Sequence, residues 1–426
     1  MGEQRIPRHL RILLGANFAS DIGSGLTLPF LLIYLHEVRH IPLGITGLLI
    51  GASSVVGVPA GPLVGTLVDK LGPRVVSMTV IAIQSLGTIA LLFVHSALSA
   101  IPVMCLYGVA QGAVWPAWNA LFAVMVHDEQ LRPKVFARSF QLLNLGLGIG
   151  SVIAGLLVHV GNPSSFTKIY LVDGLSDLVI VVALGVLPAA VFARSTLRDD
   201  APAHPRGGYR EVLSDRRFLR YLVAMTFLAS AGYAAVSTGL VGYATTVVHV
   251  GPRTIAWAFA LNTGLIVLLQ SFALRTTSRM RRTTALSICA AFFGAAWVVL
   301  GVSGIFPSSL LGNWLVISMF GVFAMGEVLL APVAAPLVTM MARPSLQGRY
   351  SALSSSIYSV TSVIGPAIAG VMLGARLRDE YLGLLVACSV AAVFSFRWLR
   401  GSLGEGLDNA PRSRATNEPE KAGVSS

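Results

Sequence analysis

Twelve apolar stretches, each long enough to cross a membrane as a helix, follow one another along the chain and constrain its fold. A helix needs about 20 mostly apolar residues to cross the hydrocarbon core of a bilayer. Such stretches, bounded by charged residues or by clusters of Pro, Gly and Ser, start near Ile12, Gly44, Val75, Ala100, Phe136, Ile169, Phe218, Thr254, Thr283, Asn313, Tyr350 and Tyr381. The sequence therefore predicts an all-α membrane protein with twelve transmembrane helices.

The composition excludes most other classes of protein. Of the 426 residues, 54% are hydrophobic and only 12% are charged, whereas soluble domains carry about 25% charged residues. This is too little polar surface for a cytosolic enzyme, a nucleic-acid-binding protein or a secreted scaffold. The three cysteines, which lie in apolar stretches, are too few for a disulfide framework.

The distribution of Lys and Arg predicts the orientation in the membrane. Successive connections between the predicted helices lie on opposite sides of the membrane. Of the 31 Lys and Arg residues, twenty-six fall in segments on the same side as the N-terminus. Cytoplasmic loops carry an excess of Lys and Arg, whereas the net charge of +12 by itself says little. We therefore expect both termini to lie in the cytoplasm, in an inner or plasma membrane.

Polar segments divide the chain into four parts. We expect an N-terminal six-helix bundle over residues 1–193, a cytoplasmic linker over 194–217 and a second six-helix bundle over 218–400. The tail at 401–426 contains charges, Pro and Ser without an apolar face, which is typical of a disordered segment.

An internal repeat relates the two predicted bundles. The sequence IGSVIAG at 149–155 returns as IGPAIAG at 364–370, and Lys134 and Arg349 are separated by the same 215 residues. The fifth and eleventh predicted helices therefore correspond to each other. Two parallel repeats of six helices, with a substrate site between them at the middle of the bilayer, are a known transporter architecture.

The connection between the second and third predicted helices has the sequence GTLVDKLGPR. It resembles the signature G-x-L-a-D-r-x-G-r-k of the major facilitator superfamily through Gly65, Leu67, Asp69, Lys70, Gly72 and Arg74. The resemblance covers essentially residues 10–400 and implies two pseudo-symmetric six-helix bundles. Within the signature, glycine permits a tight turn where helices approach closely.

In this family, the acidic residue of the signature forms a gate on the cytoplasmic side. The resemblance implies that Asp69 faces the positive N-terminal end of the eleventh helix, near Tyr350 and Ser351. This contact would latch the cytoplasmic side in the outward-facing state. A residue that only flanks a membrane turn is the alternative interpretation of Asp69.

The fifth predicted helix resembles the antiporter signature g-x-x-x-G-P-x-x-G-G. Gly146, Gly150 and Gly155 match it, while Ser151 replaces the proline and Ala154 a glycine. The pattern favours an exporter over an importer, although small residues at this spacing also serve simple helix packing.

The fourth predicted helix departs from the drug-antiporter pattern l-x-x-R-x-x-q-G. Gln111 and Gly112 match the pattern, but Gly108 occupies the position of the arginine. Because no Lys or Arg falls inside a predicted helix, a proton relay would have to use carboxylates alone.

Four carboxylates fall within predicted helices. Ionisable groups in hydrocarbon are costly and are therefore functional candidates, and removal from water favours the neutral form of an acid. We expect Asp21 and Glu327 to carry protons or to contact substrate near the middle of the membrane, with hydrogen bonding to a neighbouring helix as the alternative role. Asp173 and Asp177 lie nearer the outer end of the sixth helix, and we interpret them as structural.

Polar and aromatic side chains at similar depth predict a pocket for bulky neutral or cationic molecules. The possible lining residues are Asn17, Gln111, Trp115, Trp118, Asn119, Gln141, Asn144, Tyr233, Asn262, Gln270 and Tyr358. No phosphate-binding loop of the form G-x-x-x-x-G-K-[ST] occurs, and no His, Cys and acidic residues show metal-ligand spacing.

These observations predict a secondary active transporter and not an enzyme. We expect it to export small amphiphilic compounds by alternating access, driven by a proton gradient and without a cofactor, as a monomer in the lipid bilayer that binds no nucleic acid. The alternatives are a symporter or facilitator that imports a nutrient, and a membrane sensor or scaffold that transports nothing.

Overall fold

The computed structural model describes residues 6–126, 131–192, 209–232, 235–343 and 346–408. Within these ranges the ordered elements are helical and no strand is present. The elements are α1 (Arg8–Thr27), η1 (Leu28–Phe30), α2 (Leu31–Ile33), η2 (Tyr34–Val38), α3 (Leu43–Gly57), α4 (Ala60–Leu71), α5 (Pro73–Ala90), η3 (Leu91–Phe93), α6 (Ala97–Met125), α7 (Arg132–Leu157), α8 (Pro163–Val186), η4 (Ala189–Phe192), α9 (Tyr209–Ser214), α10 (Arg216–Ala231), η6 (Val236–Leu240), α12 (Val241–Thr246), α13 (Pro252–Thr277), α14 (Arg282–Ser303), α15 (Leu310–Met341), α16 (Gln347–Gly374), α17 (Arg378–Arg400) and α18 (Glu405–Asp408).

All twelve predicted helix starts lie inside helices, and eleven helical stretches of the described ranges are long and apolar enough to cross a membrane. The seventh predicted helix is the one that these eleven stretches do not include. Its first part, α10, ends at Ala231, and the chain continues through η6 and α12 beyond residues 233–234, which are not described. Trp297 Nε1 of α14 donates a hydrogen bond of 2.7 Å to the carbonyl oxygen of Ala231. This bond satisfies a carbonyl group that the end of α10 leaves without a helical partner.

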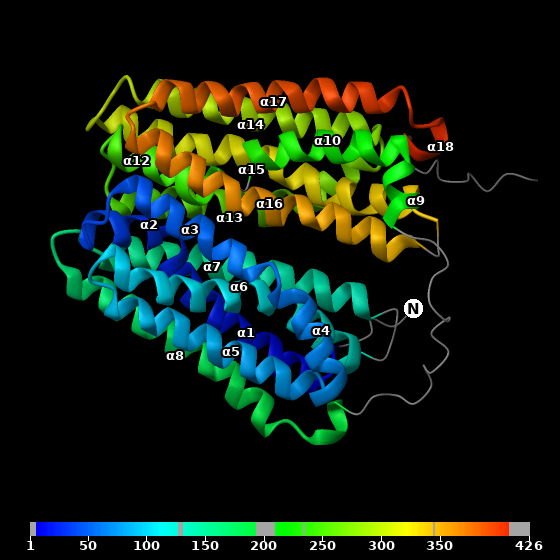
Figure 1. Ribbon diagram of the computed structural model, residues 1–426, viewed down its shortest axis with the longest axis horizontal. Coiled ribbons are helices and arrows are strands. Elements are labelled where there is room, and N and C mark those ends of the chain that lie inside the picture. Colours follow the sequence, from blue (N-terminus) through cyan, green and yellow to red (C-terminus); the bar gives the residue numbers. More distant parts are fainter. Residues whose placement is uncertain (1–5, 127–130, 193–208, 233–234, 344–345, 409–426) are drawn as a thin grey trace, which may run out of the picture.

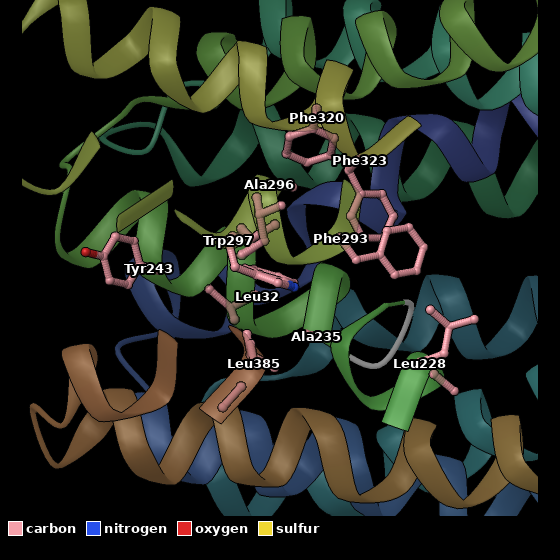
Figure 2. Close-up of a cluster of buried hydrophobic side chains, with 14 of the residues drawn as sticks. Leu32, Leu228, Ala235, Tyr243, Phe293, Ala296, Trp297, Phe320, Phe323 and Leu385 are labelled. Atoms are coloured by element: carbon pink, nitrogen blue, oxygen red, sulfur yellow. The ribbon is translucent and has the colours of Figure 1, made fainter. Parts of the chain in front are cut away.

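Large side chains of α14 form the centre of the second bundle (Figure 2). Trp297 is fully buried, and the ring of Phe293 stacks on Phe323 of α15 with 4.2 Å between the ring centroids. Both α15 and α17 pack against α14. Aromatic side chains bury large apolar areas, so α14 anchors this bundle.

The two bundles meet along two seams, one between α3 and α16 and the other between α7 and α13. At the first seam, a Cβ atom on Gly47 would lie 2.6 Å from the Cα atom of Gly370. At the second, a Cβ atom on Gly155 would collide with Ala256. We call the end of the molecule that carries α9 and α18 the linker end, and the opposite end the far end. These seam contacts lie at the far end. The bundles diverge toward the linker end (Figure 1).

The seams have the symmetry that the sequence repeat predicts. Residues 149–155 lie in α7, which packs on α13, and the corresponding residues 364–370 lie in α16, which packs on α3. Each repeated segment thus lies in a helix that packs against a helix of the other bundle. This arrangement confirms the prediction of two pseudo-symmetric bundles.

The beginning of the predicted disordered tail is ordered in the structure. Asp408 of α18 is buried, and its Oδ1 accepts hydrogen bonds of 2.9 Å from both the backbone nitrogen and the hydroxyl group of Thr283. Arg282 Nη1 also donates to the carbonyl oxygen of Leu407 at 2.7 Å. These bonds at the start of α14 order residues 401–408; residues 409–426 lie outside the described ranges.

Removing the Asp408 carboxylate is expected to weaken the attachment of α18. The carboxylate acts like an N-terminal cap of α14, and losing such a cap costs about 1 kcal/mol. We therefore expect Asp408→Ala to lower the thermal unfolding temperature of the purified protein. A double-mutant cycle with Thr283→Val measures the coupling, and fully additive effects would show that the bonds contribute nothing to stability.

Candidate functional site

Glu327 lies near the middle of α15 and is half-buried. The preceding residue, Gly326, packs on α14, where a Cβ atom would lie 2.9 Å from the carbonyl oxygen of Cys289. Successive residues of a helix point about 100° apart, so Glu327 points to a different side of α15 from Gly326. Its Oε2 accepts a hydrogen bond of 3.2 Å from Asn262 Nδ2 of α13. The structure thus brings together two residues that the sequence analysis named separately.

The residue after Asn262 lies in the seam between the bundles. A Cβ atom on Gly148 of α7 would collide with the Oγ1 atom of Thr263. Helix α13 therefore contacts Glu327 through Asn262 and the other bundle through Thr263. The sequence analysis did not identify Thr263, because nothing in an apolar helix shows which threonine faces a glycine of another helix.

Asp21 lies in the first bundle and also has an amide partner. It is 7% exposed, and its Oδ2 accepts a hydrogen bond of 2.7 Å from Asn17 Nδ2 one helical turn earlier. A Cβ atom on Gly146 of α7 would lie 2.6 Å from the Cβ atom of Asp21. The two acid–amide pairs thus lie in different bundles, one against α7 and the other between α13 and α15.

Asp173 and Asp177 lie deep inside the first bundle, on the face of α8 that packs on α1. Ser20 Oγ donates to Asp177 Oδ1, and Thr27 Oγ1 donates to Asp173 Oδ2, each at 2.5 Å. Gln84 Nε2 of α5 donates to Asp177 Oδ1 at 3.1 Å. The sequence analysis missed these three donors. The available signal was the spacing of Ser20 and Thr27. They are seven residues, or about two helical turns, apart and therefore lie on the same face of the helix.

Gln111, Trp115 and Asn119 lie at four-residue intervals on one exposed face of α6. Trp115 is 55% exposed. Uncharged amides are poorly solvated by lipid tails, so a face with two of them is better suited to water or substrate than to hydrocarbon. Gln111 Nε2 also donates to the hydroxyl group of Tyr107 at 2.7 Å.

The remaining candidates for a pocket lining have varied surroundings. Trp118 is 9% exposed and packs on Phe122, with 5.4 Å between ring centroids, in the core of the first bundle. Asn144 is buried and donates to the carbonyl oxygen of Phe140 in its own helix. Gln141 is exposed, Gln270 and Tyr358 are half-buried, and Tyr233 lies outside the described residues.

The gating signature covers the second half of α4, Gly72 after it and the first residues of α5. Gly72 has a φ of +81°, which strains any residue with a side chain, whereas a Cβ atom on Gly65 would meet nothing within 4 Å. Arg74 Nη2 donates to the carbonyl oxygen of Gly185 of α8 at 2.8 Å, and Lys70 is exposed. The side chain of Asp69 lies outside the described residues. The expected close helix approach at Gly65 is absent from this conformation.

The glycines of the fifth-helix signature face two different neighbours. A Cβ atom on Gly150 would collide with the carbonyl oxygen of Ile22 in α1, and one on Gly146 would meet Asp21. Gly155 instead faces Ala256 across the seam. The signature therefore places α7 directly against α1 in its own bundle and against α13 in the other.

At the N-terminal end of α16, Tyr350 contacts its own bundle. Its hydroxyl group donates to Asp215 Oδ2 at 2.8 Å, and its ring packs on Phe218 with 4.4 Å between centroids. Nearby, Arg343 forms an ion pair of 2.8 Å with Glu211 of α9. Among the described residues, no three His, Cys, Asp or Glu side chains come together in a group that could hold a metal ion.

The sequence profile of the Major Facilitator Superfamily matches residues 13–250 and 222–425 of the chain. The chain belongs to this family. Major facilitator proteins are transporters and not enzymes, and they bind small molecules within the lipid bilayer.

Three curated major facilitator relatives align over most of the chain. The uncharacterized MFS-type transporter YttB of Bacillus subtilis is 24% identical over 92% of this chain and 96% of its own length. The Na(+), Li(+), K(+)/H(+) antiporter of Planococcus maritimus is 21% identical over 84% and 88%. The quinolone resistance protein NorA of Staphylococcus aureus is 23% identical over 88% and 92%.

Solved major facilitator structures share the fold. The nucleoside transporter NupG superposes with a TM-score of 0.73 at 12% identity, covering 92% of this chain and 99% of its own. A bacterial homologue of the human lysosomal transporter Spinster, in an inward-facing conformation, gives 0.70 at 14% identity and covers 95% and 98%. At such identities the likeness concerns the fold alone.

Proposed function

We propose that the protein is a proton-coupled exporter of small amphiphilic compounds, neutral or cationic, that works by alternating access. The observation that carries this proposal is the hydrogen bond between Asn262 and Glu327 beside the α7–α13 seam. An ionisable group next to a moving interface is what coupling of a proton to a conformational change requires. The relatives named for quinolone resistance and cation/proton antiport support export.

The coupling step follows from the chemistry of the pair. The amide of Asn262 donates to the Glu327 carboxylate, and a hydrogen bond to a charged acceptor is stronger than one to a neutral acceptor. Protonation of Glu327 therefore weakens the tie between α15 and α13. Because α13 also carries Thr263 in the seam, the protonation state biases the contact between the bundles.

The exposed face of α6 supplies a surface that suits amphiphilic molecules. Trp115 offers an aromatic ring for stacking and cation–π contact, and Gln111 and Asn119 offer neutral hydrogen-bonding groups. Few charges lie within the helices, so selectivity for shape and hydrophobicity is expected rather than recognition of one polar metabolite.

The membrane orientation is part of the proposal. The chain enters α1 and ends α18 at the linker end (Figure 1), and twenty-six of the 31 Lys and Arg residues are assigned to that side. We infer that the linker end is cytoplasmic, that the membrane is the plasma membrane and that the transporter acts as a monomer, with the proton gradient as its energy source and no cofactor.

Transport by vesicles of defined orientation tests the direction. The purified protein is reconstituted into proteoliposomes, and a panel of fluorescent dyes and a metabolite extract are assayed with a pH gradient of either sign. Export predicts dye uptake only in inside-out vesicles. Uptake of a metabolite in right-side-out vesicles would instead indicate an importing symporter or facilitator, and the absence of any flux would favour a sensor or scaffold.

Asp69→Asn tests the proposed gate at the linker end. The substitution removes the charge that the N-terminal dipole of α16 attracts, at a cost of about 0.3–1 kcal/mol to the outward-facing state. We expect cysteine labelling from the cytoplasmic side to increase and transport to fall, with expression unchanged. Unchanged labelling and transport would leave Asp69 as a turn residue.

A further inference from the structure

The first bundle buries a pair of aspartates that the proposed coupling at Glu327 does not use. Asp173 and Asp177 lie one helical turn apart on α8 and are 3% and 0% exposed. Like charges at this spacing repel each other, and an ionised carboxylate is costly to bury without compensation. The pair therefore requires a positive or proton-donating partner.

Donors from two neighbouring helices satisfy one oxygen atom of each carboxylate. Asp177 Oδ1 accepts from both Ser20 and Gln84, and Asp173 Oδ2 accepts from Thr27. These donors belong to α1 and α5, so three helices converge on the pair. Within the described ranges, no Lys or Arg forms an ion pair with either aspartate.

The other oxygen atom of each carboxylate has no partner among the described residues. Asp173 Oδ1 and Asp177 Oδ2 are buried without a hydrogen bond, as is the hydroxyl group of Tyr170 one turn earlier on α8. Buried polar atoms are nearly always paired. Three such oxygen atoms lie within about two turns of α8, so the site lacks a donor or a cation among the described residues.

Gly23 of α1 lies directly beside one of these oxygen atoms. A Cβ atom at this position would collide with Ser176 Oγ and would lie 2.8 Å from Asp173 Oδ1. A larger residue would therefore displace the carboxylate. The glycine lets α8 bring Asp173 directly against α1.

The pair has a polar connection to the exposed face of α6. Tyr107 lies within electrostatic range of both aspartates, and its hydroxyl group accepts the hydrogen bond from Gln111. Gln111 begins the exposed row with Trp115. The other titratable side chains that face the pair are Asp21 of α1 and Tyr170 of α8, while α5 contributes only the neutral Gln84 and Ser85.

We propose that Asp173 and Asp177, together with the hydroxyl groups of Ser20 and Thr27, form a second ion site that binds one monovalent cation, either a proton or an alkali-metal ion. The groups around the unpaired atoms are carboxylates and hydroxyls, and such oxygen ligands suit hard cations. The bound cation neutralises part of the buried charge and links α8 to α1. Only the role of this site in transport rests on the proposed function, because ion binding is measurable without transport.

Thermal unfolding of the full-length protein in detergent tests the site. The increase in reaction of the three cysteines, of which Cys289 is fully buried, with a fluorogenic maleimide reports unfolding. A pH series is recorded in N-methylglucamine buffer, and NaCl, LiCl or KCl is then compared with choline chloride at equal ionic strength. An alkali-ion site predicts an unfolding temperature that rises with the logarithm of the ion concentration. A proton site predicts a pH-dependent unfolding temperature that the alkali ions do not change.

Substitutions assign the response to the pair. Asp173→Asn and Asp177→Asn are expected to abolish the ion response or to flatten the pH response, whereas Asp379→Asn, at an exposed site, retains both. Glu327→Gln is expected to retain the ion response as well, which separates this site from the proposed transport site. Wild-type responses in the double Asp173→Asn/Asp177→Asn variant would overturn the proposal.

A milder variant keeps the test decisive if the asparagine variants fail to fold. Ser20→Ala removes one hydroxyl group from Asp177 and leaves both carboxylates in place. We expect it to change the apparent affinity for the cation by about tenfold or more, because hydrogen bonds to charged groups are stronger than those between neutral groups. An unchanged affinity for protons and for all three alkali ions would equally overturn the proposal.

Discussion

Glu327→Gln is expected to abolish export against a gradient while leaving the protein folded. Glutamine keeps the size of the side chain and its ability to hydrogen-bond with Asn262, but it cannot take up and release a proton. Export driven by a pH gradient should therefore fall by about tenfold or more, toward the leak of protein-free vesicles, because a fixed neutral site no longer alternates between two states. Glu327→Asp retains the charge and should keep partial activity.

Binding should respond differently from transport in this variant. A neutral lipophilic dye should bind within a few-fold of its wild-type affinity, since its contacts do not depend on the charge. A cationic dye should bind more weakly, because a carboxylate in a medium of low dielectric attracts cations far more strongly than one in water. This separation of binding from uphill transport distinguishes a proton carrier from a residue that only packs.

The measurement is dye efflux from energised proteoliposomes, with protein quantity and monodispersity checked for each variant. Glu37→Gln is the matched control, because Glu37 lies in η2 at the far end of the molecule and its side chain is 36% exposed. The control should transport like the wild type. Full gradient-driven efflux by Glu327→Gln would remove Glu327 from the mechanism and make Asp21 the leading candidate.

The helices and the repeat could be predicted from the sequence because both are local or periodic features. Apolar length alone identifies a membrane helix, and all twelve predicted starts lie in helices. The interruption after Ala231 was missed, since the apolar stretch continues through it and the bond to Trp297 is formed by residues far apart in sequence. The ordered start of the tail was missed for the same reason, because Thr283, which binds Asp408, lies 125 residues away.

The site was harder to predict because membrane helices are apolar on all sides. Without an amphipathic pattern, the sequence does not show which face of a helix points inward. From their place near the outer end of the sixth helix we interpret the aspartates of α8 as structural. Nothing in the sequence shows that both lie on the inward face of that helix, each with one oxygen atom that has no partner among the described residues. Asn262 and Glu327 were both named, but their pairing depends on the packing of α13 on α15.

Gly47→Ala is expected to open the α3–α16 seam at the far end and to slow transport. The added Cβ atom would collide with the carbonyl oxygen of Pro366 and lie 2.6 Å from the Cα atom of Gly370. Both are backbone atoms, which cannot rotate away as a side chain can. Overpacking of this kind costs about 1–3 kcal/mol, which corresponds to a shift of about 5–150-fold in a two-state equilibrium. The conformation with the far end closed should lose that much of its population.

Gly44→Ala is the matched control for this prediction, because it lies one turn earlier on the same helix. A Cβ atom on Gly44 would lie 3.6 Å from the carbonyl oxygen of Gly370, an ordinary van der Waals contact. The reporter is Leu373→Cys, a buried position near the far end of α16, in a background without the native cysteines. Labelling by a membrane-impermeant maleimide from the far side should increase in Gly47→Ala and stay unchanged in Gly44→Ala. Equal labelling in both variants would show that the seam tolerates a methyl group, and the two bundles would then have to be held closed by other contacts, such as those of the α7–α13 seam.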